Sequence, residues 1–217
     1  SYIKNEPIIP AKSPAVDLDI NNNGVSEVSG NNHTVTVSGG SFSSGSDGAA
    51  GSAIEFDGVN DFQNTDYIRV DDSGALPRGS DDFSISLKIN FNSIDAISDK
   101  VLFATSQLDQ CSLSVSRANK GLMFFSGGNN IIAPTSLSWN MGQWYDIAVT
   151  KVGNDYTIYR DGVVTGSANS SQTNGSSLAN NDFTFGRRSD NAHPIHGKLD
   201  EIKIFKTGIS ATDITHL

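Results

Sequence analysis

The chain has a single cysteine, Cys111, among its 217 residues, and this scarcity excludes an internal disulfide framework. The fold must therefore be stabilised by its hydrophobic core. Cys111 lies at the start of a predicted strand with no histidine or other base beside it, so we interpret it as a small buried side chain. Long apolar runs are absent too. None approaches the roughly 18 residues of a membrane-spanning helix, which predicts no membrane insertion.

Charge is also sparse, and positive charge is the scarcer kind. Charged residues make up 18% of the chain, and 24 acidic residues against 15 lysines and arginines leave a formal net charge of −9. Proteins that bind nucleic acid present a basic surface to the phosphates. The composition therefore predicts no nucleic-acid partner.

The residues that are plentiful are those of short strands and turns. Residues 83–91 alternate apolar and polar side chains, as a strand with one buried face does. Other short strands follow at spacings of about 8 to 12 residues, whereas the Gly/Ser-rich residues 38–51 predict a loop. Ser210 and Asp213 have the spacing of a helix cap. We therefore predict an all-β fold, a two-sheet antiparallel β-sandwich of the jelly-roll type with a short C-terminal helical turn.

The first residues differ in character from the rest. Pro7, Pro10 and Pro14 are spaced so that residues 1–15 cannot form a helix and favour an extended chain. We interpret this segment as an extended arm or linker, and residues 16–217 as one sandwich domain. As an arm, it would bind other protein subunits.

Four segments taken together are similar to one known family. They are Ser29-Gly30-Asn31-Asn32, the run from Ala53 to Asp61, the run from Trp144 to the Asp161-Gly162 turn, and the run from Gly197 to Ile214. In this order they resemble the laminin-G-like domains of the concanavalin A-like lectin/glucanase superfamily. The resemblance implies two antiparallel sheets packed face to face, with loops at one edge that often bind ligands. It also implies that Trp144 is a core residue.

The resemblance further implies a structural Ca²⁺ ion, which takes six to eight oxygen ligands. The corresponding residues here are Glu27, Asn31 and Asp200, with Glu27 one methylene longer than the family's usual aspartate. The alternative is that Asp200 caps a turn or faces solvent. The acidic segment at residues 57–66 is a second candidate metal site.

Glycan binding is the second chemistry that the resemblance implies. Sugars are held by aromatic rings and by planar amide, carboxylate and guanidinium groups. Candidate ligand-binding residues lie in two predicted loops and are Trp139, Asn140, Arg187, Arg188, Asp190, Asn191 and His193. Each candidate also has a structural alternative. Trp139 would pack on the rim of the sandwich, Arg187 and Arg188 would pair with acidic residues, and His193 would be a surface histidine.

Catalytic signatures are missing from the sequence. Glycoside hydrolases need two carboxylates across the scissile bond, and the run Glu-x-Asp-x-x-Glu, which supplies them in this superfamily, is absent, as is Gly-x-Ser-x-Gly. We therefore predict that the chain is not an enzyme. The third alternative is a polysaccharide lyase or hydrolase.

These observations predict a non-catalytic, lectin-like module that binds a glycan or an extracellular surface, with calcium as a structural ion. The alternative is a structural decoration, fibre or adhesion component of a virus particle or cell surface. In either case we expect an extracellular, secreted or surface-exposed protein, or one carried on a virus particle.

Overall fold

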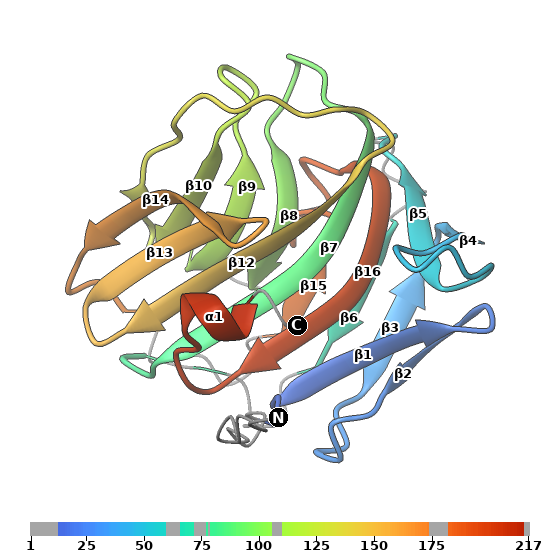
Figure 1. Cartoon of the computed structure of the whole chain (residues 1–217), viewed down its shortest axis with the longest axis horizontal. Coiled ribbons are helices and arrows are strands. Elements are labelled where there is room, and N and C mark those ends of the chain that lie inside the picture. The colour runs from blue at the N-terminus through green and yellow to red at the C-terminus, as the bar shows by residue number, and fades with distance from the viewer. Residues whose placement is uncertain are drawn as a thin grey trace, which may run out of the picture.

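The computed structural model describes residues 13–59, 66–71, 77, 79–105, 110–173 and 182–214, and these form two β-sheets packed face to face (Figure 1). The nine-stranded sheet has the order β14 (Val163–Asn169), β13 (Asp155–Arg160), β12 (Trp144–Val152), β7 (Phe83–Ser93), β16 (His196–Phe205), β1 (Val16–Asn21) and β2 (Gly24–Glu27), with β5 (Ala53–Asp57) paired to β16 and β4 (Ser41–Ser43) paired to β5. The seven-stranded sheet has the order β11 (Asn129–Ile132), β10 (Leu122–Ser126), β9 (Cys111–Val115), β8 (Lys100–Thr105), β15 (Phe183–Phe185), β6 (Tyr67–Val70) and β3 (Val35–Ser38). The predicted all-β antiparallel sandwich is confirmed.

One continuous apolar layer lies between the two sheets. In β7 the alternating residues Phe83, Ile85, Leu87, Ile89 and Phe91 are at most 3% exposed, and they belong to the same core cluster. Complete burial of one such side chain contributes about 1.5 to 3 kcal/mol. The period-2 pattern of residues 83–91 therefore identified the strand and its buried face correctly.

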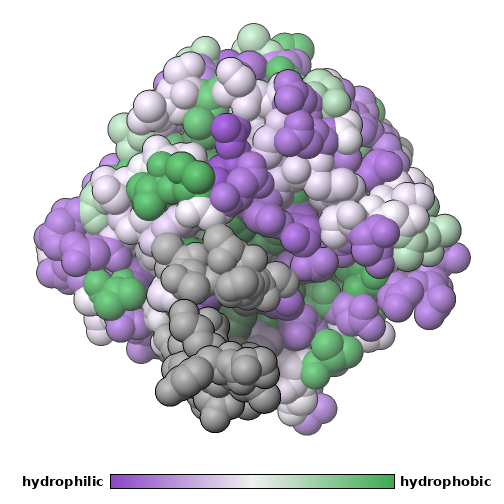
Figure 2. Space-filling view, viewed as in Figure 1, coloured by the Kyte–Doolittle hydropathy of each residue, from purple (hydrophilic) through white to green (hydrophobic). Residues whose placement is uncertain are grey.

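Within the described ranges, the outer surface of the nine-stranded sheet has no comparable apolar layer, only the small buried cluster of Ala148, Phe205, Ile209 and Ile214. Hydrophobic residues form small separate patches among hydrophilic ones wherever described atoms are visible (Figure 2). None of the helices in the described ranges is long and apolar enough to cross a membrane.

The register of β12 corrects the expectation that Trp144 is a core residue. Tyr145, Ile147 and Val149 are buried and face the opposite sheet, which leaves the half-buried Trp144 on the outer side of the strand.

Residues 38–51 also differ from the predicted loop, because Ser41–Ser43 forms the edge strand β4. All three residues of this strand are at least partly exposed, so it has no apolar periodicity to detect.

The predicted turn and helix signals hold. Asp161 and Gly162 have positive φ angles of 53° and 73° and connect β13 to β14 as a two-residue hairpin. Ser210 and Asp213 bond reciprocally, the Asp213 N–H to Ser210 Oγ and the Ser210 N–H to Asp213 Oδ2, and begin the short helix α1 (Ala211–Ile214). The predicted arm at residues 1–15 lies almost entirely outside the described residues, which begin at residue 13.

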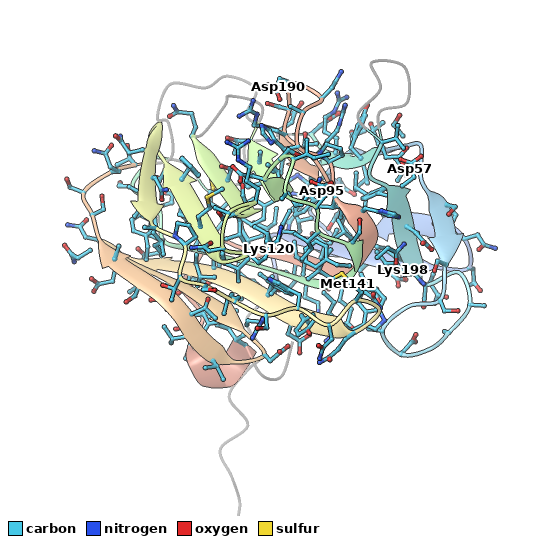
Figure 3. The ribbon with its side chains drawn as sticks, turned by 90° about the horizontal axis from the view of Figure 1, so that it is seen from above. Asp57, Asp95, Lys120, Met141, Asp190 and Lys198 are labelled. Carbon is cyan, nitrogen blue, oxygen red and sulfur yellow. The ribbon has the colours of Figure 1, made fainter. Side chains whose placement is uncertain are left out.

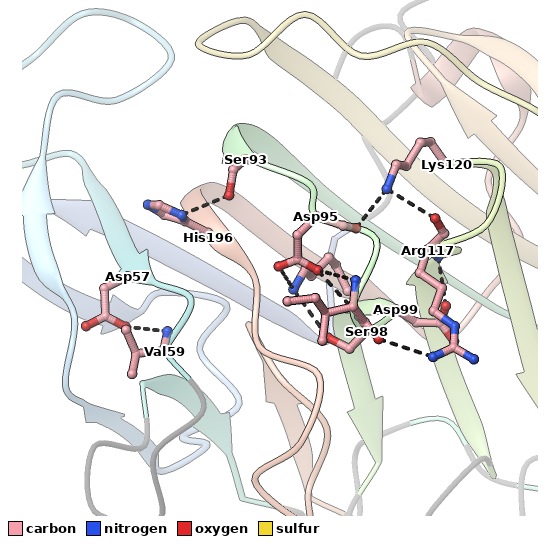
Figure 4. A network of polar contacts seen from close by, with 11 residues as sticks. Asp57, Val59, Ser93, Asp95, Ser98, Asp99, Arg117, Lys120 and His196 are labelled. Atoms are coloured by element: carbon pink, nitrogen blue, oxygen red, sulfur yellow. Dashed lines mark hydrogen bonds and ion pairs between the residues drawn. The ribbon is translucent and has the colours of Figure 1, made fainter.

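The loop between β7 and β8 lies at one end of the sandwich, which Figure 3 shows from above. Lys100, whose side chain is only 3% exposed, donates from Nζ to Asp95 Oδ2 at 2.9 Å. Lys120 and Arg117 hold the same loop by donating to the carbonyl oxygens of Asp95 and Ile97, respectively (Figure 4). A buried cation and two surface cations thus hold this loop in place.

The thiol of Cys111 should be inert in the native protein. Burial raises the pKa of the Cys111 thiol, and only the thiolate reacts with disulfide reagents. We expect no labelling by an aromatic disulfide reagent at neutral pH until guanidinium unfolds the chain. Labelling of the native protein at the rate of a free cysteine peptide would contradict the buried position.

The substitution Asp95→Asn should destabilise the protein at neutral pH. The hydrogen bond from Lys100 holds the pKa of Asp95 below its usual range, so its contribution is present above about pH 4 and is lost as the pH falls toward the folded pKa. Because the Asp95 side chain is 42% exposed, we expect a loss of about 1 to 2 kcal/mol, less than for a fully buried pair.

Urea unfolding at pH 7 and pH 3 measures this loss. The difference between wild type and the variant should shrink at pH 3. Asp19→Asn, at an exposed position of β1, is the control and should change little. Equal stabilities of wild type and Asp95→Asn at pH 7 would show that the pair contributes nothing.

Candidate functional site

A polar hollow lies on the outer side of the seven-stranded sheet, where β6 and β15 pair. Core residues alternate with outward residues on both strands, so Tyr67, Arg69 and Thr184 point away from the core. The hollow has a volume of about 160 Å³ and is lined by Tyr67, Arg69, Asp182, Thr184, Arg187 and Ser189. We call it the Arg187 hollow.

The backbone after β15 sets the position of Arg187. Gly186 has a φ angle of 94°, and a Cβ at this position would lie 2.4 Å from the ring of the buried Phe56. Only glycine fits both constraints without strain. The Gly186 N–H donates to the carbonyl of Leu102 and its own carbonyl accepts from Ile195 N–H, both at 2.9 Å. The turn is therefore held on both sides, and Arg187 leaves it at a defined point.

Arg187 is buried with hydrogen-bonding capacity unused. It is 8% exposed, and its Nε and Nη1 atoms have no hydrogen-bond partner. Its Cζ lies 4.2 Å from the centre of the Tyr67 ring, a cation–π contact. Burial lowers the pKa of Arg187, and the nearby carboxylates of Asp190 and Asp66 only partly oppose this. Removing guanidinium donors from water without replacement partners costs free energy, and a hydrogen-bond acceptor placed beside this side chain would recover part of that cost.

The second arginine of the hollow, in contrast, is paired. Arg69 Nε lies 3.0 Å from Asp71 Oδ1 and 3.7 Å from Asp182 Oδ2. The hydroxyl of Ser189 resembles Arg187 instead, since its Oγ is buried with no partner. Arg187 and Ser189 thus supply the buried polar atoms of the lining that have no hydrogen-bond partner.

The predicted residues that follow Arg187 hold their own loop together. Arg188 donates from Nε and Nη2 to the two carboxylate oxygens of Asp190 at 3.0 and 2.8 Å, a bidentate ion pair. Asn191 and His193 have positive φ angles of 66° and 60°. The carbonyl of His193 accepts from Val101 N–H at 3.0 Å, and its buried Nδ1 has no partner. Of the predicted residues in this loop, Arg187 is the one that lines the hollow.

Trp139 and Asn140 lie elsewhere. The indole N–H of Trp139 donates to the Lys120 carbonyl at 2.7 Å, and its ring packs edge-on against Phe91 and Tyr145. Arg160 lies over the same ring, with Cζ 5.0 Å from its centre. This is the packed position on the rim that the sequence left open as the alternative.

Asn140 is exposed and forms a turn with Gln143. Figure 3 places Met141, the next residue, on the side of the nine-stranded sheet, and Asp190 on the opposite side. The structure therefore does not bring the two predicted groups of ligand-binding residues together.

The three predicted calcium ligands do not form one site in this arrangement. Leu18 pairs with both Glu27 and Ile202, so the register places Glu27 on the core-facing side of its sheet. Asp200 pairs with Lys88 and lies on the outer side. Both Asp200 carboxylate oxygens accept hydrogen bonds, Oδ2 from the N–H and hydroxyl of Ser46 and Oδ1 from Glu201 N–H.

The environment of Glu27 is different. Its Oε1 accepts from Asp17 N–H and Ser29 N–H at 3.2 and 2.9 Å, while Oε2 is buried with no partner. The side chains of Ser29 and Asn31 both bond the carbonyl oxygen of Ala15. The Ala15 carbonyl is thus already contacted by Ser29, Asn31 and His33 Nε2, and Asn31 uses its amide nitrogen. Glu27 Oε2 is the unpartnered oxygen here, and carboxylate is a ligand that Ca²⁺ prefers.

The second candidate metal site, the acidic segment at residues 57–66, is only partly described by the structure. Residues 60–65 lie outside the described residues, and Asp66 uses Oδ1 to accept from Gly40 N–H at 2.9 Å. Within the described ranges, no three His, Cys, Asp or Glu side chains form a group that could hold a metal ion.

The sequence missed most of the Arg187 hollow. The alternation in residues 67–70 does place Tyr67 and Arg69 on one face of a strand. Nothing in the sequence shows, however, that this strand pairs with the one at 183–185. The neighbourhood of Tyr67 and Arg187 exists only once the sheet has formed.

Several solved structures share this fold at low sequence identity. Domain 4 of AbnA, a GH43 extracellular arabinanase from Geobacillus stearothermophilus solved in complex with arabinotriose, superposes with a TM-score of 0.69 at 18% identity, over 94% of this chain and 97% of that one. The binding domain of Paraclostridial Mosquitocidal Protein 1 superposes with a TM-score of 0.69 at 16% identity, over 94% of this chain and 51% of that one. The binding domain of botulinum neurotoxin DC, in complex with rat synaptotagmin II, gives a TM-score of 0.70 at 15% identity, over 94% and 50%.

This chain thus spans about half the length of the two toxin domains. These identities establish the fold alone. No curated protein matches the sequence. A sequence profile of the concanavalin A-like lectin/glucanases superfamily matches residues 62–215, most of the chain. Together with the two-sheet sandwich, this match shows that the chain belongs to the concanavalin A-like lectin/glucanases superfamily, as its laminin-G-like sequence pattern predicted.

Proposed function

We propose that the protein is a non-catalytic, lectin-like module that binds a glycan in the Arg187 hollow. The observation that carries the proposal is the guanidinium of Arg187, which lines the polar hollow and has two buried nitrogens without a hydrogen-bond partner. Sugars offer hydroxyl oxygens to such donors and C–H faces to aromatic rings such as that of Tyr67. Thr184 and Ser189 add hydroxyl groups to the same surface.

The structural neighbours support a binding role of this kind. One of them was solved with a bound arabinotriose and another with a protein receptor, synaptotagmin II. The fold of this chain is therefore one on which both glycans and proteins are bound. The Arg187 hollow, small and polar, favours the glycan.

The same hollow favours binding over hydrolysis. Glycosidases place two carboxyl groups across the scissile bond, whereas the described lining of the hollow has one carboxylate, that of Asp182. A polysaccharide lyase is the enzymatic alternative, because Tyr67 lies beside an arginine. We expect no release of unsaturated or reducing ends when the protein is incubated with polysaccharides, and release of either would favour the enzymatic alternative.

A structural role in a surface assembly is the second candidate. It rests on the Pro-containing arm, whose first 12 residues lie outside the described ones. Both roles place the protein outside the cell or on a particle surface. Light scattering of the purified chain separates them, because an assembly component should associate and a binding module should not.

The Tyr67→Ala variant should lose glycan binding. A glycan array followed by isothermal titration calorimetry identifies the ligand of the wild type and measures its affinity. Because Tyr67 supports Arg187 and offers a ring to the sugar, we expect affinity to fall at least tenfold, about 1.4 kcal/mol. Phe42→Ala removes an exposed aromatic ring from β4 and is the matched control. Equal affinities of Tyr67→Ala and wild type would place the glycan elsewhere.

We also propose that calcium binds at Glu27, where a buried carboxylate oxygen has no partner. Saturating Ca²⁺ should raise the melting temperature above the value in EDTA. Glu27→Gln should abolish this rise. Asp200→Asn, whose carboxylate is occupied by Ser46 and Glu201, should lower the melting temperature but keep the calcium-dependent rise. A rise that survives Glu27→Gln would rule out this site.

A further inference from the structure

We infer that the Arg187 hollow selects an anionic group on its ligand, a sugar carboxylate or sulfate. This inference rests on the proposed function and narrows it to acidic glycans. Neutral sugars could satisfy the donors of Arg187 as well, so the distinction depends on the charges that face the ligand.

The charges around the hollow are unevenly paired. Its lining includes two guanidinium groups, Arg69 and Arg187, and one carboxylate, Asp182. That carboxylate lies 3.7 Å from Arg69, and Arg69 has a second acidic partner in Asp71 at 3.0 Å. Both carboxylates thus lie against Arg69, and neither is hydrogen-bonded to Nε or Nη1 of Arg187. A guanidinium without a bonded carboxylate attracts anions locally, although the chain as a whole has a net charge of −9.

The nearest acids do not satisfy Arg187. Asp66 and Asp190 both influence its pKa, yet both are bonded to other groups. Asp66 Oδ1 accepts from Gly40 N–H at 2.9 Å, and Asp190 uses both oxygens to bind Arg188. The adjacent loop thus pairs Arg188 with Asp190 and leaves Arg187 without a carboxylate.

Neutral donors complete an anion site. Ser189 has a buried hydroxyl with no partner, and Thr184 presents its side chain from the floor of the hollow. The Tyr67 ring, 4.2 Å from Arg187 Cζ, supports the guanidinium from one side. An anion at this point would accept charge-assisted hydrogen bonds, which are about twice as strong as neutral ones. Asp182 is the one lining carboxylate that an anion would face, and Arg69 lies next to it.

The effect of replacing Arg187 on the free energy of unfolding should differ from the effect of replacing an arginine that stabilises the fold. Replacement of Arg187 by an apolar side chain of similar length removes a desolvated charge, so it should leave the free protein as stable as before or more so. The same replacement should abolish binding. An arginine that holds the fold together would instead lower stability when replaced.

The experiment compares wild type with Arg187→Met and Ser189→Ala. Arg117→Met is the control, because it removes the same charge from an exposed position. Urea midpoints are measured first without ligand. Nitrogen-15 NMR spectra of the arginine side chains are then recorded in sodium glucuronate, sodium sulfate, glucose and sodium chloride at matched ionic strength.

We expect glucuronate or sulfate to shift one arginine Nε–H signal of the wild type in a saturable way, and glucose and chloride to leave it unmoved. That signal should be absent from Arg187→Met, whose urea midpoint should equal or exceed that of the wild type. Ser189→Ala should bind the anion at least threefold more weakly. Arg117→Met should bind it as the wild type does.

Three results would overturn the inference: no saturable shift with either anion, an equal shift with glucose, or a lower urea midpoint for Arg187→Met. The glycan array separates this failure from failure of the proposed function. If a neutral glycan binds the wild type and not Arg187→Met, the hollow is a glycan site without anion selection. If no glycan binding depends on Arg187, the proposed site itself is wrong.

Discussion

The apolar layer between the two sheets is the constraint on which the rest of the structure depends. Every strand that contributes to it has one face committed to burial, and because side chains alternate along a strand, the other face must point outward. The outward residues are free to differ in chemistry. On β6 they are Tyr67 and Arg69, and on β15 the outward residue is Thr184. The Arg187 hollow is thus a consequence of how the core orients its strands.

The polar hollow depends on that layer in a second way. Phe56 is fully buried in the core, and its ring is what excludes any side chain at Gly186. The chain therefore turns at a glycine immediately before Arg187. The guanidinium then lies over the Tyr67 ring and not in solvent. Burying the charge of Arg187 without a partner lowers the stability of the fold. The protein tolerates this loss because its large apolar core stabilises the folded state.

Charge pairing divides the arginines of this region into two classes. Arg69 and Arg188 have carboxylate partners, and Arg188 and its partner are only two residues apart. Such pairs are common on protein surfaces and contribute little to stability. Arg187 has no such partner, although it is the more deeply buried. This contrast between neighbours in sequence is the reason that we propose Arg187, and not Arg188, as a binding residue.

The sequence by itself determined the class of fold and most of its strands, because period-2 alternation and the Asp161–Gly162 and Ser210–Asp213 signals act over a few residues. It did not reveal β4, whose exposed edge position leaves no apolar pattern, and the family pattern placed Trp144 on the wrong face of its strand. Of the site, it identified Arg187 as a candidate but grouped it with Trp139, which packs against Phe91 and Tyr145 instead. Only the tertiary structure decided which strands are neighbours, and therefore that Tyr67 lies beneath Arg187 and that Glu27 and Asp200 lie on opposite faces of a sheet. The pairings of β6 with β15 and of β7 with β16 join residues more than one hundred positions apart, and local patterns carry no record of them.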